Sequence, residues 1–170
     1  MSYSKRKYIK ALETIVYLAE REQRNYWILK AIYFADKEHL RRYGRQLFGD
    51  YYRAMKQGPV PSLAYDIVKC ARGDGYIEFT DPHPATAIEV PNKFIIVPKR
   101  TANIDYLSKS EIESLDFALN LVSPLDFNAL KELSHDSAYT AVQQDEEMTL
   151  ESIVNSLENC AEIMDYLYTE

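Results

Sequence analysis

One segment, residues 26–43, restricts the possible folds more than any other part of the chain. Its apolar residues run around the whole circumference of a helix as far as Ala35. A helix that is apolar on every side belongs in the centre of a protein, where other elements cover it. From Asp36 onward the segment becomes charged, and Gly44 follows as a C-terminal cap. We therefore expect a central helix whose far end reaches the surface.

Shorter segments with helical spacing lie on both sides of this one. Residues 4–20 place an apolar stripe on one face with Ser4 as a cap, and Ser108 precedes Glu111 with the spacing of a capping box. Further helices are expected over residues 61–72 with Pro61 in the first turn, 108–122, 126–134 with Asp126 as the cap and Leu133 facing inward, one or two turns within 137–143, and 150–166 with Ala161 facing inward.

Short extended segments are expected between the early and the late helices. Residues 46–56 indicate a loop that enters a strand, and residues 58–61 indicate a rigid corner because their two prolines fix the backbone. Two further strands are expected at residues 76–79 and 93–97, separated by a proline-containing loop. The predicted fold class is mainly α: a single-domain helical bundle, residues 1–170, with a small antiparallel β-ribbon inserted between the early and late helices.

Charge is distributed unevenly along the chain. The 170 residues carry a formal net charge of −6. Residues 1–100 hold 18 basic and 11 acidic side chains, a balance of +7, whereas residues 101–170 hold 2 and 15, a balance of −13. This pattern fits either one basic and one acidic surface that steer a charged partner, or a fold that mixes the two signs. The net acidity argues against a general nucleic-acid binder.

Neither a signal peptide nor a membrane span is expected from the sequence. Its two cysteines, Cys70 and Cys160, lack the spacing of a zinc site and favour a reduced, intracellular protein. The basic residues 5–7 are followed by neither an apolar core nor a cleavage site, and no apolar stretch is long enough to span a membrane. We therefore expect a cytoplasmic protein.

A metal site is one interpretation of the histidines. Asp36 and His39 are three residues apart and share a helix face, and His135 with Asp136 could complete a site of two imidazoles and two carboxylates. Such a site would make the protein a metal-dependent enzyme that uses Asp36, His39 and His135. The other interpretation is that both histidines are hydrogen-bonded structural residues at helix ends. No G-x-S-x-G motif or phosphate-binding loop is present.

Basic and aromatic residues alternate at the end of the central helix and beyond it. This mixture is typical of protein contact sites and of single-stranded nucleic-acid sites, and it also occurs on solvated helix ends. Because no wider basic face accompanies it, we favour protein contact. We expect this helix end and the corner at residues 58–61 to lie side by side as one rigid docking surface. The residues in the mixture are Arg41, Arg42, Tyr43, Arg45, Tyr51, Tyr52 and Arg53.

Several motifs, here called the signature motifs, together resemble one protein family. They are Lys30-x-Ile32-Tyr33-Phe34-Ala35-Asp36-x-x-His39-Leu40-x-x-Tyr43-Gly44-Arg45, then Gly49-Asp50, Gly58-Pro59-Val60-Pro61-Ser62-x-x-Tyr65-Asp66, Leu107-Ser108-x-Ser110-Glu111-Ile112 and Leu133-Ser134-His135-Asp136-x-Ala138-Tyr139. On these motifs the chain resembles the SocA-like antitoxin family, also called the Panacea domain, over roughly residues 8–145. One departure is Tyr139, where the family often has tryptophan.

The resemblance implies a bacterial or phage antitoxin that neutralises a cognate toxin by direct binding, with no enzymatic activity and no cofactor. The toxin would be encoded next to it. A family member that delivers its toxin to an AAA+ protease makes a proteolytic adaptor the alternative. A DNA-binding autorepressor is disfavoured by the charge. The residues that we expect to contact the partner are Asp36, His39, Arg41, Arg42, Tyr43, Arg45, Tyr51, Tyr52, Gly58, Pro59, Val60, Pro61, His135 and Asp136.

Overall fold

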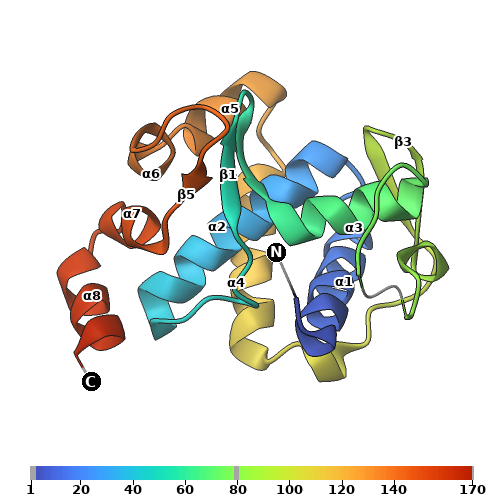
Figure 1. Cartoon of the computed structure of the whole chain (residues 1–170), viewed down its shortest axis with the longest axis horizontal. Coiled ribbons are helices and arrows are strands. Elements are labelled where there is room, and N and C mark those ends of the chain that lie inside the picture. The colour runs from blue at the N-terminus through green and yellow to red at the C-terminus, as the bar shows by residue number, and fades with distance from the viewer. Residues whose placement is uncertain (1–2, 79–80, 170) are drawn as a thin grey trace.

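Helix α2, Asn25–Tyr43, runs through the middle of the computed structural model, which describes residues 3–78 and 81–169 (Figure 1). The side chains of Ile28, Ala31 and Ile32 have no exposed surface. Gly44 ends the helix in the left-handed conformation, with its N–H bonded to the carbonyl of Leu40. The prediction of a central helix is therefore confirmed.

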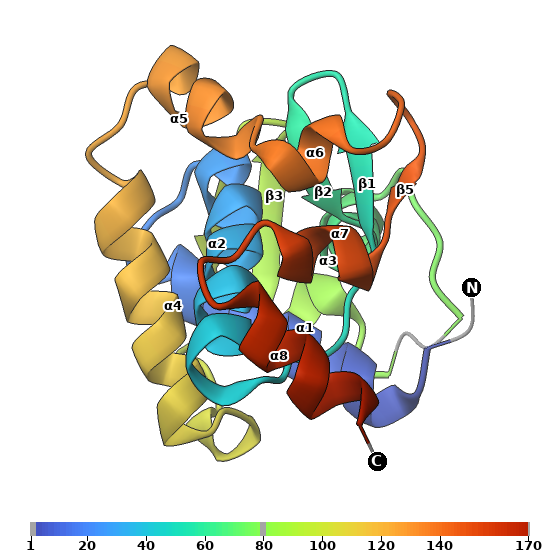
Figure 2. The same cartoon turned by 90° about the vertical axis from the view of Figure 1, so that its left-hand side faces the viewer.

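The other helices surround α2 and make the fold mainly α, as predicted. Helix α4 packs along α2, and Figure 2 shows the two side by side. Ser4 and Asp126 cap their helices, and Ser108 with Glu111 forms the predicted capping box. The helices are α1 (Lys5–Ala19), α3 (Ser62–Arg72), α4 (Lys109–Val122), α5 (Phe127–Ser134), α6 (Ser137–Thr140), α7 (Leu150–Asn155) and α8 (Cys160–Tyr168), with 3₁₀ turns at Pro84–Thr86 and Ile104–Tyr106.

The segment predicted as a rigid corner is a strand. Strands β1, Tyr52–Met55, and β2, Gly58–Pro61, form an antiparallel hairpin, and β5, Glu147–Met148, pairs with the other side of β1. Strand β2 lies at the edge of this sheet, where a proline's missing N–H is tolerated. Its last residue, Pro61, is the N-cap of α3 rather than part of the first helical turn.

The second small sheet differs from the prediction at one strand. Residues 76–78 are irregular, and Phe79 lies outside the described residues. The strand lies instead within the expected loop, as β3, Ile88–Asn92, which pairs antiparallel with β4, Ile95–Pro98. Ile88 and Val90 are buried in β3 whereas Glu89 is exposed, so its side chains alternate as in a half-buried strand. A register shift between Glu89 and Asn92 spans the proline within β3.

Strand β4 also fixes the start of the central helix. The N–H of Asn25 donates to the carbonyl of Phe94 at 2.8 Å, and the N–H of Ile96 donates to the carbonyl of Gln23 at 2.8 Å. An isolated bridge joins Arg24 to Ile95. The turn before α2 therefore continues the ribbon for a few residues.

The predicted helix over residues 150–166 is two helices. α7 ends at Asn155 and α8 begins at Cys160, with the chain turning between them. Asn159, in this turn, donates to the carbonyl of Arg41 at 2.9 Å, so the break is tied to the end of α2. Ala161 and Leu133, both expected to face inward, are exposed. None of the described helices is long and apolar enough to cross a membrane.

Candidate functional site

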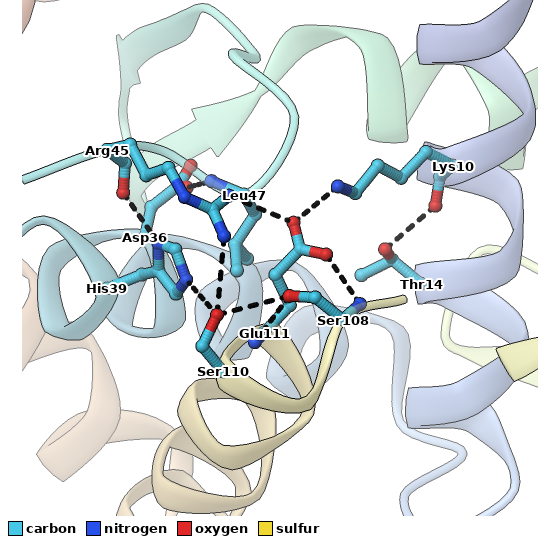
Figure 3. A network of polar contacts seen from close by, with 9 residues as sticks. All are labelled: Lys10, Thr14, Asp36, His39, Arg45, Leu47, Ser108, Ser110 and Glu111. Carbon is cyan, nitrogen blue, oxygen red and sulfur yellow. Dashed lines mark hydrogen bonds and ion pairs between the residues drawn. The ribbon is translucent and has the colours of Figure 1, made fainter. Parts of the chain in front are cut away.

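The signature motifs meet in two polar networks, one at each side of α2. The first joins α2 to the loop that follows it and to the start of α4 (Figure 3). At its centre the carboxylate of Asp36 accepts the main-chain N–H of Leu47 at 2.8 Å and a short hydrogen bond from the hydroxyl of Tyr52. Asp36 is 1% exposed, and burial raises its pKa to about 7. The carboxyl group therefore fixes the loop and strand β1 against the central helix.

His39 connects the same loop to α4. Its Nδ1 lies 2.7 Å from the carbonyl of Arg45, and its Nε2 lies 3.0 Å from the hydroxyl of Ser110 (Figure 3). A carbonyl can only accept, so Nδ1 carries the proton and Nε2 accepts from the serine. Burial lowers the pKa of His39, which keeps the ring neutral. Both ring nitrogens are thus used within the chain.

Glu111 completes this network from the first turn of α4. Its carboxylate accepts the N–H of Ser108 at 2.8 Å and forms a short ion pair with Lys10 of α1. Arg45 lies 3.6 Å from the same group. Burial alone would raise the pKa of Glu111, but the hydrogen bonds from Lys10 and Ser108 outweigh it and the pKa lies below the ordinary value. Three segments far apart in sequence are joined at this one carboxylate.

The second network lies on the other side of α2, where strand β2 meets α5. Lys30 is 1% exposed and donates to the carbonyl of Pro59 at 2.7 Å. Burial lowers the pKa of Lys30 to about 7. Gly58 has a φ of +117°, and a Cβ at that position would lie 2.5 Å from the hydroxyl oxygen of Ser134 and 3.1 Å from Cε of Lys30. Only glycine fits this junction without displacing its neighbours.

Asp136 extends the second network to α6. It accepts hydrogen bonds from the hydroxyl of Tyr33 at 2.7 Å and from the ammonium of Lys37 at 2.8 Å. It also caps α6 through the N–H of Tyr139 at 3.0 Å. His135 stacks on the ring of Tyr139 with centroids 4.2 Å apart, and its Nε2 is buried without a hydrogen-bond partner among the described residues.

The four residues proposed for a metal site are divided between these networks. Asp36 and His39 lie in the first, whereas His135 and Asp136 lie in the second. Within residues 3–78 and 81–169, no three His, Cys, Asp or Glu side chains are placed to hold a metal ion. The alternative grouping of Asp36, His39 and His135 as a metal site is therefore wrong, because the α2 pair takes partners from the following loop, β1 and α4.

The expected side-by-side packing of the helix end and the 58–61 segment is also wrong. The segment packs against Lys30, near the start of α2, whereas Tyr43 reaches Glu113 on α4. Thirteen residues of helix separate Lys30 from Tyr43, which corresponds to about 20 Å. On one side, the end of α2 is instead in contact with α8, whose Tyr166 lies against Gly44, whereas the side chains of Arg41, Arg42 and Tyr43 remain exposed.

The expected contact residues differ widely in exposure. Because a buried side chain is not available to a partner, only part of the set can form a surface. The buried members are Asp36, His39, Tyr52, Gly58, Pro59 and Pro61, the half-buried members are Val60, His135 and Asp136, and the exposed members are Arg41, Arg42, Tyr43, Arg45 and Tyr51.

Several residues of these networks were not recognised as site residues from the sequence. Lys30, Ser110 and Glu111 lie within the signature motifs but are ordinary residues for a helix. Asp50 is a further case, since its carboxylate accepts the N–H groups of Leu63 and Ala64 at the start of α3. It caps a helix that begins 12 positions later in the chain, so no local capping pattern identifies it.

The family comparison agrees with the segments that form the two networks. A model of the family described as antitoxin SocA-like, Panacea domain, matches residues 28–139, from α2 to α6. The chain therefore belongs to the SocA-like antitoxin family, as the signature motifs indicated. Comparison with curated proteins and with solved structures gave no match.

Proposed function

We propose that this protein is an antitoxin that neutralises a cognate toxin by direct protein–protein binding, acting as a binding protein rather than an enzyme. The observation that carries the proposal is the match of the antitoxin family model to residues 28–139. The toxin is a protein encoded by the adjacent reading frame, and both act in the cytoplasm of a bacterium or a phage-infected cell.

The arrangement of the signature residues supports a binding role. The buried polar groups of Asp36, His39 and Glu111 make contacts within the chain, and these contacts hold α2, the hairpin and α4 in one fixed geometry. A partner-binding surface on such a rigid structure loses little conformational entropy when the partner binds, and this small loss favours high affinity. We assign the toxin contact to the exposed members of the expected set, which lie at and beyond the end of α2: Arg41, Arg42, Tyr43, Arg45 and Tyr51.

Coexpression tests the proposal. The adjacent reading frame is expressed from an inducible promoter, alone and together with this protein, and growth is followed. We expect growth arrest without this protein, recovery with it, and copurification of the two chains at a fixed stoichiometry. A neighbour that is harmless alone, or that remains toxic in the presence of this protein, would overturn the proposal.

The same strains separate neutralisation by binding from delivery to an AAA+ protease. Toxin half-life is measured after translation is stopped, with and without this protein. Direct binding leaves the toxin as stable as before, or more stable. A half-life that shortens only when this protein is present would establish the adaptor mechanism instead.

A further inference from the structure

A groove of about 580 Å³ lies at the opposite end of α2 from the exposed arginines. Its walls come from four parts of the chain: the start of α2, the β1–β2 turn, α3, and the turn that leads into β4, with α5 at its border. The groove is lined mainly by apolar surface, and its volume is within the range of ordinary ligand and peptide sites. None of the 14 expected contact residues except Val60 lines it.

Aromatic side chains form most of the groove wall. Tyr26 packs against Phe127 with ring centroids 4.7 Å apart and against Trp27 at 5.7 Å. Phe94 is 66% exposed and Phe127 is 39% exposed, so large rings remain open to solvent beside the groove. The hydroxyl of Tyr26 and the indole N–H of Trp27 are already bonded to main-chain carbonyls, which fixes both rings. Fixed, partly exposed aromatic rings are typical of the energetic centre of protein interfaces.

Every ionisable lining residue other than tyrosine is basic. The five basic lining residues are Arg24, Lys30, Lys56, Arg72 and Lys93, and no Asp or Glu is among the lining residues. This is a strong local excess in a chain whose net charge is −6. Arg24 and Arg72 are paired with Glu22 and Asp74 beside the groove, but Lys30, Lys56 and Lys93 form no ion pair with any residue that the structure describes.

Lys30 is the unusual member of this set. It is almost fully buried, its nitrogen lies 4.5 Å from the centre of the Tyr26 ring, and its hydrogen bond goes to a neutral carbonyl. Burial lowers the pKa of Lys30 to about 7 and leaves its nitrogen closed to a partner, so Lys30 contributes to the groove wall rather than to the charge that a partner meets. Lys56 and Lys93 are exposed at the rim, where they would attract an acidic partner over a distance.

We propose that this groove is a docking site for an acidic, apolar segment of the toxin, whose apolar side chains lie on the aromatic wall and whose carboxylates face Lys56 and Lys93 at the rim. This inference rests on the proposed function and adds a second contact surface to it, at the start of α2. The charge complementarity selects this occupant, because a basic segment would meet the like charges of Lys56 and Lys93, and a purely apolar one would leave these two lysines unpaired.

A matched pair of double variants tests the proposal. Lys56→Glu with Lys93→Glu reverses the two rim charges, and Arg6→Glu with Lys109→Glu makes the same change in net charge at exposed positions that do not line the groove. Affinity for the product of the adjacent reading frame is measured for both variants and for the wild type over a series of salt concentrations. We expect at least a tenfold weaker affinity and a reduced salt dependence for the groove variant only.

Trp27 gives a direct readout at the site, because it is the only tryptophan in the chain and lies in the groove wall. Overlapping 15-residue peptides that cover the toxin and contain no tryptophan are titrated against the wild-type protein. We expect the emission of Trp27 to shift with one acidic, apolar peptide, and the shift to be lost when its Glu and Asp residues are replaced by Gln and Asn.

The outcomes separate the groove from the proposed function. If the wild-type protein neutralises the toxin and the groove variant binds it equally well, or the Gln and Asn peptide binds as tightly as the acidic one, the groove proposal is wrong and the antitoxin function stands. If the control variant loses as much affinity as the groove variant, the groove proposal is also wrong. If the wild-type protein does not bind the product of the adjacent frame, both proposals are overturned.

Discussion

The carboxylate of Asp36 accepts the main-chain N–H of Leu47 at 2.8 Å, in a part of the protein from which water is excluded. Eleven residues separate the two in the chain, so this hydrogen bond closes the loop that follows α2. Because the loop leads directly into β1, the position of the hairpin on α2 depends on it. A buried acid in this role makes stability sensitive to pH.

We expect Asp36→Asn to flatten the dependence of unfolding free energy on pH between pH 4 and 7. In the folded protein Asp36 has a pKa of about 7, against 3.8 for the free side chain, so the folded state binds the extra proton in this interval. Stability from this group is therefore present below pH 4 and is lost as the pH rises to 7, by at most about 4 kcal/mol. Urea unfolding at several pH values measures the effect.

The control for this experiment is Asp36→Ala. Alanine also removes the titration, but it leaves the N–H of Leu47 buried without an acceptor, which costs about 1–3 kcal/mol at every pH. We expect the alanine variant to be uniformly less stable and the asparagine variant less affected. An unchanged pH profile in Asp36→Asn would show that the carboxyl group is ionised in the folded protein.

Gly58→Ala should destabilise the protein more than Gly73→Ala does. Both glycines have a positive φ, +117° and +96°, so both substitutions carry a backbone cost of about 1–3 kcal/mol. A Cβ at Gly73 meets nothing within 4 Å, whereas one at Gly58 lies 2.5 Å from the hydroxyl oxygen of Ser134. Thermal unfolding of the two variants therefore isolates the steric contribution at the junction of β2 with α5.

Adding Ser134→Ala to Gly58→Ala checks this cause. The second substitution removes the oxygen atom that the new Cβ would approach most closely. We expect the double variant to recover stability relative to Gly58→Ala alone, although Ser134→Ala by itself loses the bond to the carbonyl of Lys131. Additive losses would mean that the chain relieves the contact in another way.

The contributions of Lys10 and Glu111 to the stability of the fold should be strongly coupled. Removing Lys10 leaves a carboxylate that is 1% exposed, and removing Glu111 also leaves the N–H of Ser108 without its acceptor. We expect Glu111→Ala to lower the unfolding free energy by about 3–5 kcal/mol. The double-mutant cycle of Glu111→Ala with Lys10→Met should give a coupling free energy of about 1–2 kcal/mol between the two residues. Urea unfolding of the two single variants and the double variant measures it.

The pH dependence gives an independent check on Glu111. Its pKa is lowered in the folded protein, so its contribution is present above the ordinary value of 4.5 and is lost as the pH falls below it. The difference in stability between the wild type and Glu111→Gln should therefore shrink on acidification. A difference that grows at low pH would contradict the assigned ion pair.

Arg42→Glu should weaken toxin binding at a small cost to the fold. Arg42 is exposed and forms no ion pair with a described residue, but it lies in the last turn of α2, where an acidic side chain opposes the helix dipole, so we expect the unfolding free energy to fall by about 1 kcal/mol. If the end of α2 contacts the toxin, affinity should fall by about tenfold, whereas Lys109→Glu should have little effect. Binding titrations and growth recovery provide the readouts, and equal affinities would exclude this surface.

Local chemistry allowed much of the fold to be predicted from the sequence. The all-round apolar pattern before Ala35, the capping box at Ser108 and the glycine after Tyr43 act over a few residues, and the structure confirms each of them. The strand predicted at residues 76–79 was wrong over the described residues 76–78, because a short segment of strand-forming residues does not by itself provide a pairing partner. The break before α8 was missed because Asn159 bonds to Arg41, 118 positions away.

For the candidate site, too, the sequence showed local patterns but not contacts between distant segments. The signature motifs identified the family, but they did not show whether their residues face a partner or the interior. The sequence is compatible with His39 as a structural residue or as a ligand, and only the positions of Arg45 and Ser110 show that both of its ring nitrogens have partners within the chain. The groove was not predicted, since its lining residues come from distant segments and form no motif.

The sequence by itself determined the central helix, the capped starts of α1, α4 and α5, and the family, because periodicity, caps and motif spacing depend on neighbours along the chain. Only the tertiary structure decided that Asp36 and His39 are buried, that Lys30 lies beneath Pro59, and that lysines and aromatic rings share a groove. The burial and the charge environment of a side chain depend on segments that are brought together in space. The same side chain can therefore bind a metal, hold two elements of the fold together or contact a partner, according to which residues pack against it.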